Sequence, residues 1–166
     1  MGQPPGPPGP PGTGPRPPGP QQQLPPGLKV LVIEANLIKD KDLFGKQDPY
    51  VKLNLAGQAF QTRVHKNGGK TPKWGEDVVF RMANAPLQVE VWDSDTGKDD
   101  ILGKGLHNLQ YVVQQGREDI FVPLEDEGKN AGRLHLLLTM VPYSQLPQLP
   151  VPSPGMPIPA VAAPTA

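Results

Sequence analysis

Seven of the ten aspartates in this 166-residue chain lie in two short windows. The windows are residues 40–48, with Asp40, Asp42 and Asp48, and residues 93–100, with Asp93, Asp95, Asp99 and Asp100. Carboxylates this crowded repel one another, and a bound cation would offset that cost. Neither window contains His or Cys, which disfavours zinc and copper, whereas Ca²⁺ takes roughly six to eight oxygen ligands. The windows therefore predict a calcium site; the alternative is two solvated turns, where aspartate is common.

The first window also holds an apolar pair, Leu43 and Phe44, and each window carries a lysine, Lys46 and Lys98. Exposed apolar side chains can enter the interfacial layer of a membrane, and lysines attract anionic headgroups. These residues predict a membrane-binding tip beside the acids. The alternative is that one apolar side chain folds back into the core, and Phe44 is expected to be the exposed one because it lies farther from the preceding strand.

Apolar residues alternate with polar ones through most of the middle of the chain, which is typical of strands. Strands are predicted at 28–35, 50–55, 58–64, 75–82, 87–92, 101–106, 118–124 and 133–140. Residues 28–35 are more continuously apolar, which favours a central strand buried on both faces. Residues 108–116 can hold one helical turn at most. About eight strands without intervening helices predict an antiparallel β-sandwich, in which the two acid windows follow strands of the same direction and meet at one end.

Three stretches together, "DLFGKQDPYVKL", "KTPKWGEDVVF" and "VEVWDSDTGKDDILGKG", resemble the C2 domain, a calcium- and phospholipid-binding module. The likeness covers about residues 27–142. It implies an eight-stranded antiparallel sandwich. The similarity begins at "LKVLVIEANL" and ends at "GRLHLLLTMV". These limits suggest the type II topology, in which the first strand leads into the first calcium loop.

The resemblance also implies five aspartate positions that ligate calcium. Asp42 and Asp48 match the first-loop pair, and Asp93 and Asp95 match the third-loop pair. Asp100 matches the last ligand, but the third loop is one residue shorter than the common pattern, so the choice between Asp99 and Asp100 stays open. Asp40 is an outer candidate, and two ions are expected rather than three.

A weaker basic patch is predicted from Lys52, Arg63 and His65, which could share one concave face. In some C2 domains such a patch binds phosphoinositides; the alternative is a solvated face. Trp74 is expected to anchor the core or a corner. His107 and His135 have no metal-type partners and are expected to be structural.

Both ends of the chain are rich in proline. Residues 1–26 contain 12 of the 24 prolines and residues 142–166 contain 8. Such composition predicts disordered or polyproline II tails at 1–26 and 143–166, flanking the folded domain at 27–142. The tails could recruit SH3, WW or profilin-type partners, or serve as spacers. A calcium-independent adaptor is therefore the alternative to a calcium-dependent membrane module.

Other function classes are disfavoured. The formal net charge is zero, so no overall field attracts nucleic acid. Catalysis is not expected, because no motif pairs a nucleophile with a histidine and cysteine is absent. No apolar run is long enough to span a bilayer, and no secretory signal is evident. We expect a monomeric cytoplasmic signalling protein that is recruited to the membrane when calcium rises.

Overall fold

The computed structural model describes residues 2, 25–39, 46–146 and 161–162. In chain order the elements are β1 (Gly27–Leu37), β2 (Pro49–Leu55), β3 (Gln58–Gln61), β4 (Lys73–Arg81), β5 (Leu87–Asp93), β6 (Asp100–His107), α1 (Gln110–Gln115), β7 (Arg117–Asp126), β8 (Lys129–Val141), a 3-10 turn (Tyr143–Gln145) and β9 (Val161–Ala162). β1 to β8 coincide with the eight predicted strands to within a few residues. α1 lies where one helical turn at most was predicted, and its six residues make somewhat more than one turn.

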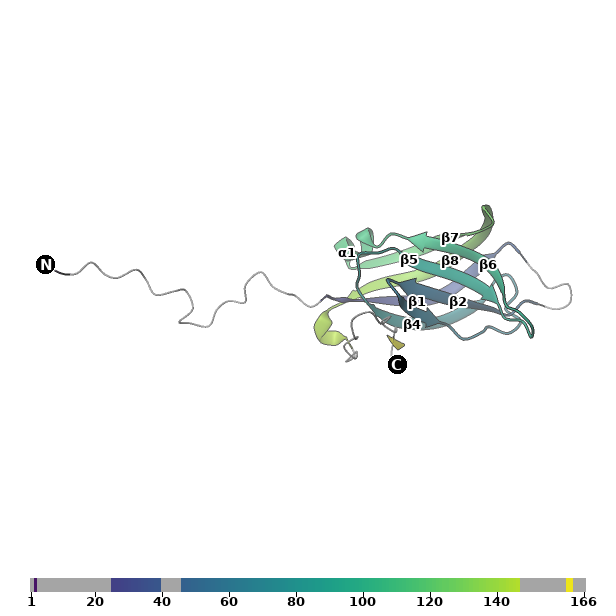
Figure 1. Ribbon diagram of the computed structural model, residues 1–166, viewed down its shortest axis with the longest axis horizontal. Coiled ribbons are helices and arrows are strands. Elements are labelled where there is room, and N and C mark those ends of the chain that lie inside the picture. The colour runs from purple at the N-terminus through teal and green to yellow at the C-terminus, as the bar shows by residue number, and fades with distance from the viewer. Residues whose placement is uncertain (1, 3–24, 40–45, 147–160, 163–166) are drawn as a thin grey trace.

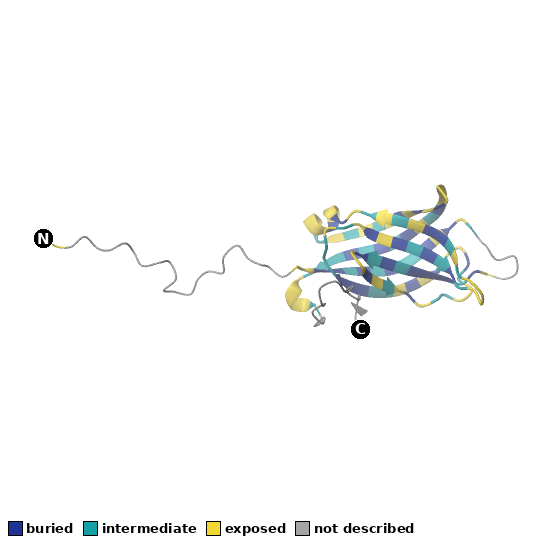
Figure 2. Cartoon of the chain, viewed as in Figure 1, coloured by how far each residue is buried: buried dark blue, intermediate teal, exposed yellow. Residues whose placement is uncertain are grey.

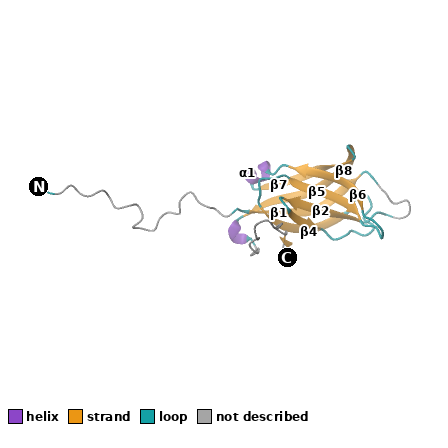
Figure 3. Ribbon diagram, viewed as in Figure 1, coloured by secondary structure: helices purple, strands orange, loops and turns teal. Residues whose placement is uncertain are grey.

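The strands form two antiparallel layers, β3-β2-β5-β6 and β7-β8-β1-β4, with β9 on the outer edge of β4 (Figures 1 and 3). The layers meet edge to edge through one bridging pair in the described register, Lys104 of β6 with Glu125 of β7. The predicted all-β antiparallel sandwich is confirmed. β1 leads directly toward the first acid window, as the type II topology requires.

Alternation decides which side chains enter the core. In β2, Val51, Leu53 and Leu55 are buried, while Lys52 and Asn54 are partly exposed. The same pattern recurs along β5 and β8, so buried and exposed residues alternate along the strands (Figure 2). The inward-facing side chains of both layers form one hydrophobic core, which fixes the strand ends that carry the acids.

β1 departs from the prediction of burial on both faces. Leu28, Val30 and Val32 are fully buried, but Leu31 and Ile33 are only partly buried. β1 lies between β8 and β4 within one layer, so only one of its faces meets the opposing layer. The apolar run in β1 therefore arises because Leu31 and Ile33 lie on an outer face that is only partly covered. β1 does not lie between two layers.

The proline-rich ends lie mostly outside the described residues. In the first, Pro25 and Pro26 precede β1, and the Pro26 carbonyl accepts a hydrogen bond from Met82 N–H at 3.0 Å. In the second, the described pieces are the turn Tyr143–Gln145 with Leu146, and β9. The domain boundaries at 27 and 142 remain predictions.

The two ends of the sandwich carry different residues. The acid end comprises Asp48, Asp93, Asp95, Asp99 and Asp100 with the strand termini that carry them. The tail end comprises Gly27, Arg81 and Val141, which face one another across β4, β1 and β8. β1 runs from the tail end toward the acid end, so the two sites lie at opposite ends of the domain (Figure 1).

Candidate metal and membrane site

The two acid windows meet at the acid end because β2 and β5 are neighbours. Their antiparallel register places Pro49 opposite Asp93. The backbone N–H of Asp48 donates to Asp93 Oδ1 at 2.7 Å, and Ser94 N–H donates to the Asp48 carbonyl at 3.0 Å. Segments about 45 positions apart in the chain are thus joined by two hydrogen bonds. The predicted meeting of the described parts of both windows is observed.

Asp93 lies at the centre of this junction. It is 1% exposed, and burying a carboxylate is costly unless polar groups or a cation compensate. Asp100, at the start of β6, is paired opposite Asp93 in the β5–β6 register. Asp95 and Asp100 are exposed. The acid end therefore combines one buried carboxylate with exposed ones beside it.

Asp99 is held by the protein itself. One carboxylate oxygen accepts the Tyr50 hydroxyl at 2.6 Å, and the other accepts Asp95 N–H at 3.0 Å. The Tyr50 hydrogen bond, followed by that of Asp95, lowers the pKa of Asp99. The pKa of Tyr50 is raised to about 12, mainly because the phenol is buried and next because it donates to Asp99. The sequence left open whether Asp99 or Asp100 is the last ligand. In the structure, both oxygens of Asp99 hold the loop through Tyr50 and Asp95.

Four predicted site residues lie outside the described residues: Asp40, Asp42, Leu43 and Phe44. Lys46 and Lys98 are both exposed, as a contact with headgroups requires. Within the described ranges, no group of three His, Cys, Asp or Glu side chains lies close enough to hold a metal ion. A complete ligand set would therefore need acids from residues 40–45.

The donor chemistry nevertheless fits calcium. Asp48, Asp93, Asp95 and Asp100 offer oxygen ligands alone, as calcium prefers. Asp48 Oδ1 also accepts Asn67 N–H at 2.7 Å, so it is already oriented by a third loop.

Gln47 is a residue that sequence reasoning missed. It is fully buried, and its Nε2 donates to the carbonyls of Lys39 (2.8 Å) and Gly69 (2.9 Å). Gly69 N–H in turn donates to the Gln47 carbonyl at 3.1 Å. Gln47 therefore connects the residues on the two sides of the 40–45 segment and joins them to the loop that contains Gly69. A polar residue between Lys46 and Asp48 gives no sign of burial in the sequence.

Lys39, which precedes the 40–45 segment, is held by an ion pair. The Lys39 ammonium forms an ion pair with Asp126, which lies at the end of β7 and is 8% exposed. The Asp126 hydrogen bond raises the pKa of Lys39. The neighbouring Ile38 is 52% exposed, an apolar side chain at the acid end that the sequence analysis did not single out.

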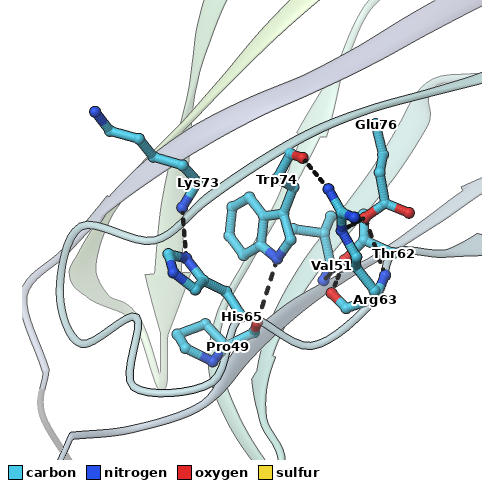
Figure 4. A network of polar contacts seen from close by, with 8 residues as sticks. All are labelled: Pro49, Val51, Thr62, Arg63, His65, Lys73, Trp74 and Glu76. Carbon is cyan, nitrogen blue, oxygen red and sulfur yellow. Dashed lines mark hydrogen bonds and ion pairs between the residues drawn. The ribbon is translucent and has the colours of Figure 1, made fainter. Parts of the chain in front are cut away.

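The three members of the predicted basic patch have different surroundings. Lys52 Nζ lies 4.4 Å from the centre of the Trp92 ring. Arg63 pairs with Glu76 at 3.5 Å and donates to the Trp74 carbonyl at 3.0 Å. These contacts turn Arg63 toward β4 (Figure 4).

His65 is also directed toward β4, because its Nδ1 accepts Lys73 N–H at 2.9 Å (Figure 4). Lys52 instead borders an open depression of about 460 Å³ whose rim includes Gln61 and Glu90. Neutral and acidic groups there weaken the attraction for phosphate. Phosphoinositide binding by Lys52, Arg63 and His65 remains a prediction.

Trp74 is buried, with 4% exposure, and its Nε1 donates to the Pro49 carbonyl at 3.2 Å. It links β4 in one layer to the start of β2 in the other, which fixes the strand that begins just after Asp48 (Figure 4). The predicted anchoring role is observed.

The two remaining histidines lie away from the acid end. His107 pairs with Glu118 at 3.2 Å, and His135 contacts Asp119 at 2.6 Å while stacking on Phe121. Each contact joins neighbouring strands of the sandwich, as expected for structural residues.

A protein-family model for the C2 domain matches residues 27–124. This chain belongs to the C2 domain family. Mouse extended synaptotagmin-1 is 39% identical over 120 residues, which cover 67% of this chain and 11% of that protein. The chain thus spans about a tenth of the length of that relative.

Solved structures agree on the fold. A calcium-bound structure of two C2 domains of extended synaptotagmin 2 matches with a TM-score of 0.63 and 33% identity, over 71% of this chain and 46% of that one. A C2 domain-containing protein matches with a TM-score of 0.62 and 26% identity, over 79% of this chain and 95% of that one. In the described part of the chain, no helix is long and apolar enough to cross a membrane.

Proposed function

We propose that this protein binds anionic phospholipid membranes in a calcium-dependent manner through the acid end. The observation that carries the proposal is the pair of hydrogen bonds between Asp48 and residues 93–94, which joins the two acid windows. Membership of the C2 family and similarity to a calcium-bound C2 structure support it. The protein would be a cytoplasmic monomer that is recruited to membranes as calcium rises.

Asp48, Asp93, Asp95 and Asp100, with Asp42 from outside the described residues, are the proposed ligands, and Asp40 is an outer candidate. Asp99 has a different proposed role: both of its oxygens hold Tyr50 and Asp95, so it positions the loop. This engagement, together with the short third loop, supports two ions rather than three. When bound, calcium would supply positive charge and open coordination positions for lipid phosphate oxygens.

Apolar contact would add to this attraction. Ile38 is exposed at the acid end, and Leu43 and Phe44 follow it in the sequence. Full burial of one large apolar side chain contributes about 1.5–3 kcal/mol, and less when burial is partial. Lys46 and Lys98 would each contribute roughly 1 kcal/mol near an anionic surface.

Co-sedimentation with phosphatidylserine vesicles, in calcium and in chelator, tests the proposal. The wild-type chain should sediment in calcium alone, and the double variant Asp93→Asn, Asp95→Asn should lose this binding. Asp119→Asn on β7 is a matched control and should behave as wild type. Equal sedimentation in calcium and chelator would contradict the proposal and favour the adaptor whose tails recruit polyproline-binding proteins.

A further inference from the structure

β4 forms the outer edge of its layer, and this edge is partly covered by the chain itself. β4 has nine residues, and β1 pairs with it along its inner side. On its outer side, β9 pairs antiparallel with two positions, Val78 with Ala162 and Val79 with Val161. A segment from near the C-terminus therefore adds a short strand to the middle of this edge. Farther along β4, the Arg81 N–H and carbonyl are bonded to the Gln58 side chain instead.

Val79 gives a second observation. Val78 and Phe80 belong to the hydrophobic core, whereas Val79 alternates to the outer face of the layer and is not part of that core. Nevertheless, Val79 is only 5% exposed. A side chain on the outer face can be this buried only if other parts of the chain cover it.

Part of that cover comes from the residues after β8. Gly27 pairs with Val141 of β8, and the turn Tyr143–Gln145 follows. A Cβ atom placed on Gly27 would clash with Leu146 Cδ2 and would lie 3.1 Å from Val79 Cγ1. Leu146 therefore packs closely over Gly27 beside Val79. After β8 the chain thus passes over this outer face at Leu146, and residues 161–162 pair with the edge of β4.

We propose that the outer edge of β4 around Val78 and Val79 is a docking site for a short extended segment, and that its occupant is the C-terminal segment of the same chain. Prolines at 159 and 164 lie on either side of β9 in the sequence and lack the N–H that a longer ladder needs. The site thus accepts a short extended apolar segment between prolines, through main-chain pairing as in strand addition.

The docking is expected to be reversible. A two-residue ladder is weak on its own, so the tether that links Leu146 to Val161 must supply a high local concentration of the segment. An exposed strand edge otherwise invites pairing with another chain, and a covering segment prevents this. The segment would therefore keep the edge closed to other copies of the chain and to extended peptides.

This inference does not rest on the proposed membrane function, because the site lies toward the tail end. Val78 and Val79 are paired with Val30 and Lys29 in the first half of β1, whereas the acid end lies beyond its last residue.

The test uses the full chain and a fluorescent peptide of residues 155–166 as the probe. The variant Val161→Pro, Ala162→Pro removes both β9 N–H groups and should open the site. Its matched control, Thr165→Pro, Ala166→Pro, adds two prolines outside β9 and should leave the site closed. Fluorescence anisotropy should show at least tenfold tighter peptide binding to the opened chain than to the wild type or the control.

Hydrogen exchange measured by mass spectrometry gives the second readout. Exchange in the β4 fragment containing Val78 and Val79 should accelerate in the opened chain and slow again when the peptide is added. Peptide binding to none of the chains, or equally to all three, would overturn the proposal. Tighter peptide binding by the control variant than by the wild type would also overturn it. A wild-type chain that sedimentation velocity shows to be a dimer would overturn it as well, if the two copies exchange their C-terminal segments.

Discussion

At the scale of single residues, the acid end depends on how each carboxylate is surrounded. Asp93 is buried and accepts the Asp48 N–H, so its orientation is fixed before any ligand arrives. Asp99 is fixed as well, but by Tyr50 and Asp95. Preorganised carboxylates of the first kind can serve a cation, whereas those of the second kind stabilise the loop.

Tyr50 gives a pH-dependent signature of this loop. Its pKa is raised to about 12, so folding holds the phenol neutral where an unfolded tyrosine would ionise. The stabilisation is complete below about pH 10 and is lost as the pH rises toward 12. In chelator, the 295 nm absorbance of wild type minus Tyr50→Phe should give a titration centred near pH 12. A midpoint near 10 would contradict both the burial of Tyr50 and its contact with Asp99.

Asp99 has the opposite dependence. Its pKa is lowered by Tyr50, so its contribution to stability is present at neutral pH and is lost as the pH falls through the lowered value. The contact therefore weakens at both extremes of pH, for separate reasons.

At the scale of elements, the loops of the acid end are held at their bases. Gln47 and the Lys39–Asp126 ion pair fix the two sides of the first loop, and Asn67 N–H fixes Asp48. Because loops carry function on rigid strands, these contacts decide how accurately the acids are placed.

Gln47→Leu should destabilise the chain and weaken its calcium affinity. Leucine cannot donate to the carbonyls of Lys39 and Gly69, and each buried group left without a partner costs about 1–3 kcal/mol. Urea unfolding should show a loss of about 2–4 kcal/mol. Gln61→Leu, at an exposed position on β3, should stay within about 0.5 kcal/mol of wild type. If both variants lower the free energy of unfolding by similar amounts, the Gln47 hydrogen bonds do not contribute specifically to stability.

Ile38→Ser should weaken calcium-dependent vesicle binding about fivefold. Ile38 is half exposed, so its insertion would contribute about 1 kcal/mol, below the range for full burial of an aliphatic side chain. Leu106→Ser removes a side chain that is 63% exposed on β6 and lies toward the tail end. Vesicle titration should distinguish the two. If Leu106→Ser has the larger effect, the membrane-facing end has been assigned wrongly.

Much of the fold was predictable because strand alternation is a local signal. The eight main strands, the helical turn and the meeting of the acid windows all followed from period and spacing. Gln47, the Tyr50–Asp99 contact and β9 were not predictable, because each depends on a partner many residues away. Burial on one face of β1 was missed for a related reason: an apolar run does not reveal what covers its second face.

At the scale of the whole molecule, the two proposed sites lie at separate ends of the sandwich. The proposed membrane site lies at the acid end, and the proposed tail docking lies toward the other, with the core of the sandwich between them. We therefore expect the two activities to be independent.

The variant Val161→Pro, Ala162→Pro should retain wild-type calcium-dependent vesicle binding, because β9 pairs with β4 far from the acid end. Co-sedimentation across a calcium titration measures this directly. The Asp93→Asn, Asp95→Asn variant should conversely leave protection of the β4 amides unchanged. A shift in either cross-measurement would show that the two ends are coupled.

The pairing of Gly27 with Val141 has a practical consequence. Because the domain is entered and left on adjacent strands, it can be spliced as a cassette into a surface loop of a host protein without stretching either junction. Both junctions would then lie at the end remote from the aspartates. Such a graft would present the acid end outward. Under the proposed function, its host would approach the bilayer in one defined orientation.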